Sequence, residues 1–333
     1  MTIEKFGTMA KRTLIRSALV AAMIAPSLSS AHAVSPYLPN SGELELTVGT
    51  KYEDYDRAWQ GKNFSRYNRV TTIQEYRAAI SYGITDRLAI DINGGYGTLT
   101  GGLGGGAGNC AHLSQDTFAG RDCQNPIPQG SRDGILDTRI GLRYAVFKEN
   151  PDLWDSLPTV AIYGGALIEG DYYPRPQALG DGASGWEIGA AFGRYWSNLQ
   201  FGVTADVTYA NVSGVVPDYL YGSFGAYKVL GKFFVTGAYR YQHSFSGWDS
   251  GYTAYAIPPG TGANDPIRDS FRILNALGRK ENFQVWEVGL GYSFDNGTSI
   301  HGTYSEVFDG RNTALRETFQ AYVTVPVQIF GGN

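Results

Sequence analysis

The stretch FGVTADVTYA, residues 201–210, alternates strictly between apolar and polar side chains. In a strand, Phe201, Val203 and Val207 lie on one face and Asp206 on the other, because successive side chains point to opposite faces. The same period of two recurs along most of the chain, which predicts strands rather than helices. The fold must therefore give each face of many strands its own surroundings.

Alternating segments occur at 43–56, 67–83, 87–99, 134–147, 157–170, 184–197, 199–211, 216–229, 232–246, 281–294, 297–308 and 314–329. Short turns rich in Asp, Asn and Gly follow the even-numbered segments, and long connections follow odd-numbered ones, near 100–133, 171–183 and 247–280. This sorting is typical of outer-membrane barrels, which have short periplasmic turns and long extracellular loops. We predict an all-β, antiparallel, up-and-down transmembrane β-barrel of twelve strands.

A secreted two-sheet β-sandwich is the alternative, with the apolar faces packed against each other as a dry core. A sandwich predicts a charged outer face, whereas the polar face here carries acids and bases in near balance. No run of 18 apolar residues occurs that could form a transmembrane helix. In lipid, a sheet must close on itself to satisfy its backbone hydrogen bonds, which favours the barrel.

The polar faces together define a set of residues predicted to line the lumen. In LDTRIGLRYAV the alternation assigns Leu136 and Ile140 to the outer face. The predicted lumen-lining residues are Glu45, Lys51, Glu75, Arg77, Asp91, Asp137, Arg139, Arg143, Glu187, Asp206, Arg240, Glu287 and Arg316. Seven acids against six bases predict little selection by ion sign. Two interpretations stay open: a polar path for solutes, or interlocking ion pairs that fill a narrow barrel.

Aromatic residues gather near the ends of the predicted strands, as expected of the two girdles of a membrane barrel. Near the short turns are Tyr82, Phe147, Tyr195, Trp196, Tyr227, Phe233, Tyr292 and Phe294. Near the long loops are Tyr52, Trp186, Tyr209, Tyr219, Tyr241, Phe245 and Tyr304.

The N-terminus has the pattern of an export signal. A basic start, the apolar stretch SALVAAMIAPSL and the small residues AHA predict cleavage after Ala33. A retained anchor is the alternative, but the apolar run is too short to span a bilayer. We expect residues 1–33 to be removed and 34–333 to form a single barrel domain. Removing four basic residues and one acidic residue from a chain of formal charge −4 leaves about −7, which argues against nucleic-acid binding.

The cysteines Cys110 and Cys123 both fall in one Gly-rich loop. In an exported protein they predict a loop disulfide. No close cysteine pair or histidine cluster predicts a metal site. The match to GxGxxA in GGLGGGAGNC is followed by Gly-rich coil and not by a helix, which argues against a nucleotide site. We expect no cofactor.

Two further features carry hypotheses. His243 would face outward near the loops, but Ser244 points to the opposite face and no G-x-S-x-G motif occurs, so we expect no enzymatic activity. Within the loop, DSFRILNALGRK predicts a short helix with Phe271, Leu274 and Leu277 on one face. Residues 266–280 would then form either a lid over the mouth or a loop packed on its neighbours.

Three stretches, YGITDRLAIDI (82–92), GILDTRIGLRYAVF (134–147) and LGDGASGWEIGAAFGRYW (179–196), resemble the outer-membrane β-barrel family named for the meta-pathway of phenol degradation. FDGRNTA at 308–314 fits the same pattern. The chain differs where the family commonly shows Pro-Thr-Gly and this sequence reads LIEGDYY, and at the end, where GGN follows Phe330. The resemblance implies a transporter-type barrel in the outer membrane of a Gram-negative bacterium.

Together these observations predict a channel or transporter for small compounds, aromatic or hydrophobic ones among them. The alternative is a non-conducting outer-membrane barrel with a structural or surface-binding role. The expected partners are outer-membrane lipid, small-molecule solutes and the outer-membrane assembly machinery, with no nucleic acid.

Overall fold

The computed structural model describes residues 34–100, 132–150, 153, 157–171, 180, 182–249 and 278–329. Every regular element in these ranges is a β-strand. The strands are β1 (Glu43–Gln60), β2 (Asn63–Thr85), β3 (Leu88–Thr100), β4 (Arg132–Ile135), β5 (Thr138–Phe147), β6 (Thr159–Ile168), β7 (Gly185–Trp196), β8 (Phe201–Val212), β9 (Tyr219–Leu230), β10 (Phe233–Ser244), β11 (Asn282–Ser293), β12 (Ser299–Arg311) and β13 (Glu317–Gln328). Within the described ranges, no helix has the length and hydropathy needed to cross a membrane.

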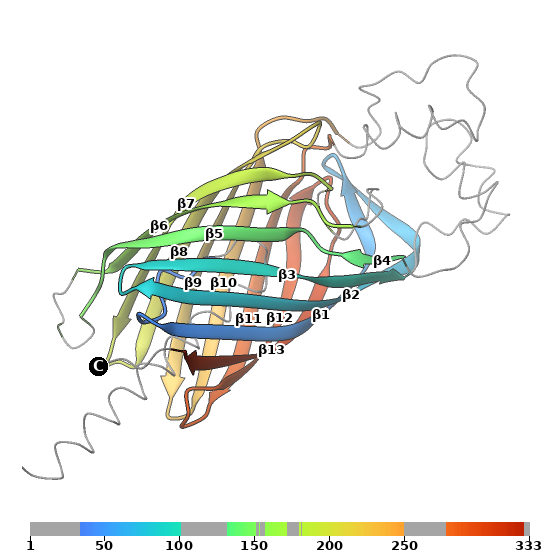
Figure 1. Cartoon of the computed structure of the whole chain (residues 1–333). Coiled ribbons are helices and arrows are strands. Elements are labelled where there is room, and N and C mark those ends of the chain that lie inside the picture. Colours follow the sequence, from blue (N-terminus) through green and yellow to red (C-terminus); the bar gives the residue numbers. More distant parts are fainter. Residues whose placement is uncertain are drawn as a thin grey trace, which may run out of the picture.

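The strands form one closed wall (Figure 1). Neighbours pair antiparallel in chain order, and β1 closes the sheet by pairing with both β2 and β13. The closing seam is in register from Glu43↔Gln328 to Asp54↔Glu317. Because β4 and β5 both pair with β3, they share one position in the wall, and the barrel has twelve strands around its circumference. The predicted barrel is confirmed.

The two ends of the barrel differ in their connections. We call the end with turns 86–87, 197–200, 231–232 and 294–298 the short-turn end, and the opposite end the loop end. Not every connection at the loop end is long, since β1 and β2 are joined by residues 61–62 alone. These two strands have 18 and 23 residues, whereas about 9–11 residues cross a bilayer. The β1–β2 hairpin therefore extends beyond the membrane at the loop end.

A break in the wall at residues 136 and 137 separates β4 from β5. Ile135 faces outward and Arg139 inward, so the alternation changes phase across the break, as at a β-bulge. Leu136 is consequently buried in the interior, where it packs with Ile73 and Leu99. The prediction that Leu136 lies on the outer face was wrong, because an extra residue in the wall cannot be read from the alternation.

Elsewhere the two faces stay separate along most of each strand, although the register also shifts at Tyr55/Arg57, Gly83/Thr85, Ala145/Phe147 and Gln284/Val285. On β8, Val207 is exposed on the outside, whereas Asp206 and Thr208 are buried inside. The outer face presents large apolar side chains all around the wall, among them Ile80, Leu142, Ile188, Val288, Leu290 and Phe319. An apolar exterior around a closed sheet is what a hydrocarbon solvent requires.

Aromatic rings form bands near both ends of the outer face. At the short-turn end the Phe233 and Tyr292 rings lie 5.0 Å apart, and at the loop end Trp186 and Tyr209 lie 5.8 Å apart. Three predicted girdle residues instead point inward and are buried: Tyr195, Tyr219 and Tyr227. Their position near a strand end suggested the girdle, but the face is set by the period of two, and Tyr195 shares its face with Glu187.

Several inward rings lie directly against glycines of the neighbouring strand. A Cβ added to Gly291 would lie 2.0 Å from the Phe234 ring, and one added to Gly202 would lie 2.2 Å from Tyr227. The absence of a side chain at these positions lets each ring rest against the wall. This arrangement keeps large side chains away from the barrel axis.

Some predictions fall outside the described residues. These are the signal peptide at 1–33, the Cys110–Cys123 disulfide, most of the loops near 100–133, 171–183 and 247–280, and the lid hypothesis for 266–280. They stay predictions.

Candidate functional site: the barrel lumen

The charged residues predicted to line the lumen lie on the inner face of the wall, apart from Asp137 at the break and Arg316 just before β13. All six predicted bases make ion pairs, with predicted acids or with Glu53 and Glu281, which the sequence analysis missed. Glu53 lies two residues after Lys51, so the alternation places both on the same face and could have predicted Glu53. Glu281 lies immediately before β11 and outside the alternation.

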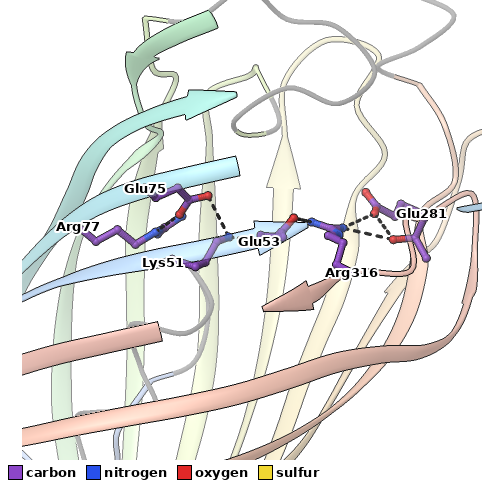
Figure 2. A network of polar contacts seen from close by, with 7 residues as sticks. Lys51, Glu53, Glu75, Arg77, Glu281 and Arg316 are labelled. Carbon is purple, nitrogen blue, oxygen red and sulfur yellow. Dashed lines mark hydrogen bonds and ion pairs between the residues drawn. The ribbon is translucent and has the colours of Figure 1, made fainter. Parts of the chain in front are cut away.

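One group of these residues forms a connected network, which we call the open network (Figure 2). Lys51 Nζ lies 2.9 Å from Glu75 Oε1 and 3.0 Å from Glu53 Oε2. Arg77 Nε donates a hydrogen bond of 2.5 Å to Glu75 Oε2. Figure 2 shows that the series of ion pairs continues through Arg316. This side chain lies 3.5 Å from Glu53 and 2.9 Å from Glu281.

Two other pairs lie deeper. Arg139 donates from Nε to Glu187 Oε1, and Arg240 Nη2 donates to Glu287 Oε1 at 2.7 Å. All four side chains are at most 6% exposed. In the open network Glu53 and Glu75 are equally buried, at 3%, whereas Lys51, Arg77, Arg316 and Glu281 are 14–34% exposed. We call the first set the closed pairs. Removing one partner of such a pair leaves a buried charge without compensation.

The other predicted residues have individual roles. Arg143 Nη2 lies 2.9 Å from Asp91 Oδ1, and Asp206 accepts a hydrogen bond from the Ser223 hydroxyl. Glu45 is buried on β1. Asp137 lies at the wall break, where its Oδ1 accepts the backbone N–H of Gly170 at 2.8 Å.

The inner face at the loop end carries two apolar clusters beside the charged residues, which the sequence analysis did not predict. One cluster contains Ala183, Ala210, Val212, Tyr219 and Tyr221, with Leu167, Val216 and Phe283 packed against it. A second contains Tyr55, Ile73, Leu99 and Leu136. We call the two clusters together the outer vestibule. The strand residues among them, apart from Leu136, continue the inward periodicity of the charged positions, so extending each polar face toward the loops would have revealed those.

The short-turn half of the lumen holds two further groups. On one side the His301 ring lies 5.2 Å from Phe234 and 5.4 Å from Tyr322, all three on the inner face. On the other side residues 34–42, which we call the N-terminal segment, run inside the barrel. Val34 contacts Tyr163, and Leu38 contacts Ala89. Both groups narrow this half of the lumen.

The geometry gives no sign of a catalytic pair at His243. Its ring lies outside, stacked on Tyr241 at a centroid distance of 6.2 Å and edge-on to Phe245 at 5.7 Å. Ser244 is buried on the inner face, where its hydroxyl donates to the carbonyl oxygen of Glu281 at 2.7 Å. Among the described residues, no group of three or more His, Cys, Asp and Glu side chains is placed to hold a metal ion.

The chain is similar in fold to an outer-membrane channel from Pseudomonas putida F1, with a TM-score of 0.60 over 90% of this chain and 100% of that chain at 9% sequence identity. The toluene transporter TodX from Pseudomonas putida aligns over 89% of this chain and 91% of its own at 11% identity, with a TM-score of 0.38 that is too low to argue from. No family model matches the sequence, and no curated protein matches it. The likeness to solved structures supports the barrel fold, and the resemblance to the phenol meta-pathway family stays a prediction.

Proposed function

We propose that this barrel is an outer-membrane channel or transporter of a Gram-negative bacterium, which takes small aromatic or hydrophobic compounds from the cell surface into its lumen. The outer vestibule is the observation that carries the proposal. Aliphatic side chains such as Val212, Leu167 and Leu99 gather on the inner face at the loop end, and an apolar solute packed against them would gain about 25 cal/mol per Å² of apolar surface buried.

The charges below the vestibule fit the same function. Because each of the six predicted bases is paired with an acid, the basic side chains add little discrimination by ion sign. A neutral solute meets no large field along such a path. In this proposal the loop end faces the outside of the cell and the short turns face the periplasm. Outer-membrane lipid and the assembly machinery are the proposed partners.

A non-conducting barrel is the second candidate, because the closed pairs and the N-terminal segment occupy so much of the lumen. The two candidates differ in solute movement. In proteoliposomes, a transporter accelerates uptake of a radiolabelled small aromatic compound, whereas a non-conducting barrel leaves it at the rate of protein-free vesicles.

Binding to the vestibule can be tested with an apolar fluorescent probe, N-phenyl-1-naphthylamine, on the refolded protein in detergent. Leu167→Gln introduces a polar group on the inner face of β6, and its neighbour Ile168→Gln introduces the same group on the outer face. We expect Leu167→Gln to weaken probe binding about tenfold, or about 1.4 kcal/mol, and Ile168→Gln to leave it unchanged. Equal affinities in the two variants would remove the main support for the proposal.

A further inference from the structure

The N-terminal segment is held inside the barrel by specific contacts along its length. Arg143 makes the central ones: its Nη1 donates to the carbonyl oxygens of Ser35 at 2.6 Å and of Tyr37 at 2.8 Å. Its Nη2 donates to Asp91 at 2.9 Å and to the Ser81 hydroxyl at 3.0 Å. One guanidinium thus binds the wall with one arm and an extended backbone with the other, which uses the fixed fork of its donors.

Tyr37 forms a second point of attachment nearer the short-turn end. Its hydroxyl donates to Glu149 Oε1 at 2.9 Å, while Glu149 Oε2 accepts the backbone N–H of Tyr195 at 2.9 Å. The Tyr37 side chain also packs on Tyr195 and Tyr227, whose rings stack at 5.9 Å. Tyr195 and Tyr227, two of the three inward tyrosines that the sequence assigned to the girdle, therefore hold this segment in place.

The inward side chains of the barrel wall are small wherever the N-terminal segment passes. Leu38 fits against three alanines from three strands, Ala89, Ala145 and Ala161. A Cβ added to Gly193 would lie 2.5 Å from Pro36, and one added to Gly83 would lie 2.0 Å from the carbonyl oxygen of Asn40. Small residues on β2, β3, β5, β6 and β7 thus leave room for one extended chain.

We propose that this part of the lumen is a binding groove for an extended peptide, and that residues 34–42 are its resident and displaceable ligand. The segment is attached by hydrogen bonds and apolar packing, without any strand pairing of its own. Its root at Gly42 is fixed, since Gly42 donates to the carbonyl of Gly83 and accepts from Ile329. Displacement of the segment opens the lumen toward the short-turn end. This gating role rests on the proposed transport function, whereas peptide binding in the groove does not depend on it.

The groove is tested by binding, independently of transport. A protein that begins at Ser41 is refolded in detergent and titrated with the peptide VSPYLPN, labelled with fluorescein at its C-terminal end, because Asn40 lies at the short-turn end of the barrel. We expect saturable binding, with at least tenfold weaker binding of a scrambled peptide. Absence of binding, or equal binding of the scrambled peptide, would overturn the proposal.

A matched pair of variants locates the binding. Ala161→Leu fills the socket of Leu38 on the inner face of β6, whereas Ala166→Leu adds the same volume on the outer face of the same strand. Peptide affinity should fall at least tenfold in the first variant and stay unchanged in the second; an equal response in both contradicts a groove at this place. In bilayer recordings the shortened barrel should conduct and added peptide should block it. If peptide binds but neither chain conducts or transports, the groove stands and the proposed function fails.

Discussion

The open network and the closed pairs are two sets of ion pairs on the inner face of the barrel, and they differ in the exposure of their basic side chains. The open network follows β1, β2 and the start of β13, beside the hairpin that extends beyond the membrane. The closed pairs join β5 to β7 and β10 to β11 and are almost inaccessible. The basic side chains of the open network stay accessible to solvent although Glu53 and Glu75 are only 3% exposed, whereas both partners of each closed pair are buried. We call the strands of the open network the open side and those of the closed pairs the packed side.

The largest expected effect distinguishes the two sides by stability. Glu187→Ala removes one partner of a closed pair and strands the Arg139 charge, so the free energy of unfolding should fall by about 3–5 kcal/mol. Glu281→Ala in the open network should cost at most about 1 kcal/mol, because solvent compensates the freed charge. Urea unfolding in lipid vesicles, followed by tryptophan fluorescence, measures both. Equal losses would mean that the two sides do not differ as described.

A smaller effect is expected from the rings that line the packed side. Gly291→Ala places a methyl group against the Phe234 ring and should cost about 1–3 kcal/mol through overpacking. Gly237→Ala on the adjacent strand is the control, since its Cβ would meet nothing closer than 3.9 Å. Combining Gly291→Ala with Phe234→Leu should restore most of the loss. A Gly291→Ala protein as stable as its control would show that the ring moves freely.

The third prediction concerns ions on the open side. Arg316→Gln removes a positive charge that is 30% exposed, so the conductance of the shortened barrel should shift toward cation selectivity. Arg316→Lys is the control and should keep the reversal potential of the unmodified barrel. The measurement is the reversal potential in a salt gradient across a planar bilayer. An unchanged potential in Arg316→Gln would place the ion path elsewhere in the lumen.

The smallest effect is a pH dependence at the short-turn end. Burial raises the pKa of Glu149 above its ordinary value near 4.5, against the opposing hydrogen bonds from Tyr195 and Tyr37 and the charge of Arg194. The folded state therefore binds this proton more tightly than the unfolded state, and stability should fall slightly as pH rises from 4.5 through the raised pKa. Unfolding midpoints across this range, compared with Glu149→Gln, measure it. The Glu149→Gln protein should not lose stability in this way as the pH rises. Identical dependence of stability on pH in the two proteins would mean that other groups cause the loss.

The sequence predicted the wall of the barrel better than its contents. The alternation found every spanning strand and the face of residues such as Asp206 and Glu187, because a period of two follows directly from strand geometry. The break at Leu136 was missed, because a single extra residue has no signature in the pattern. The tyrosines at 195 and 227 were misplaced when nearness to a rim was given more weight than their phase.

The N-terminal segment could not have been found in this way. The stretch VSPYLPN has no periodicity, and Pro36 and Pro39 only argue against helix and central strand. Its place in the lumen depends on residues such as Arg143 and Ala161 that are more than 100 positions away in the chain. Such contacts follow from the closure of the barrel and not from any local pattern.

Gly42 gives the molecule a simple topology. This residue adopts φ 75°, a conformation that favours glycine, and turns the chain where the first strand and the end of the last strand meet. The N-terminal segment therefore enters the lumen at the short-turn end, next to Gly42, and passes through no closed loop of the polypeptide. The N-terminal segment can therefore enter the lumen after β13 has paired with β1, and leave it later, without breaking the hydrogen bonds between these two strands.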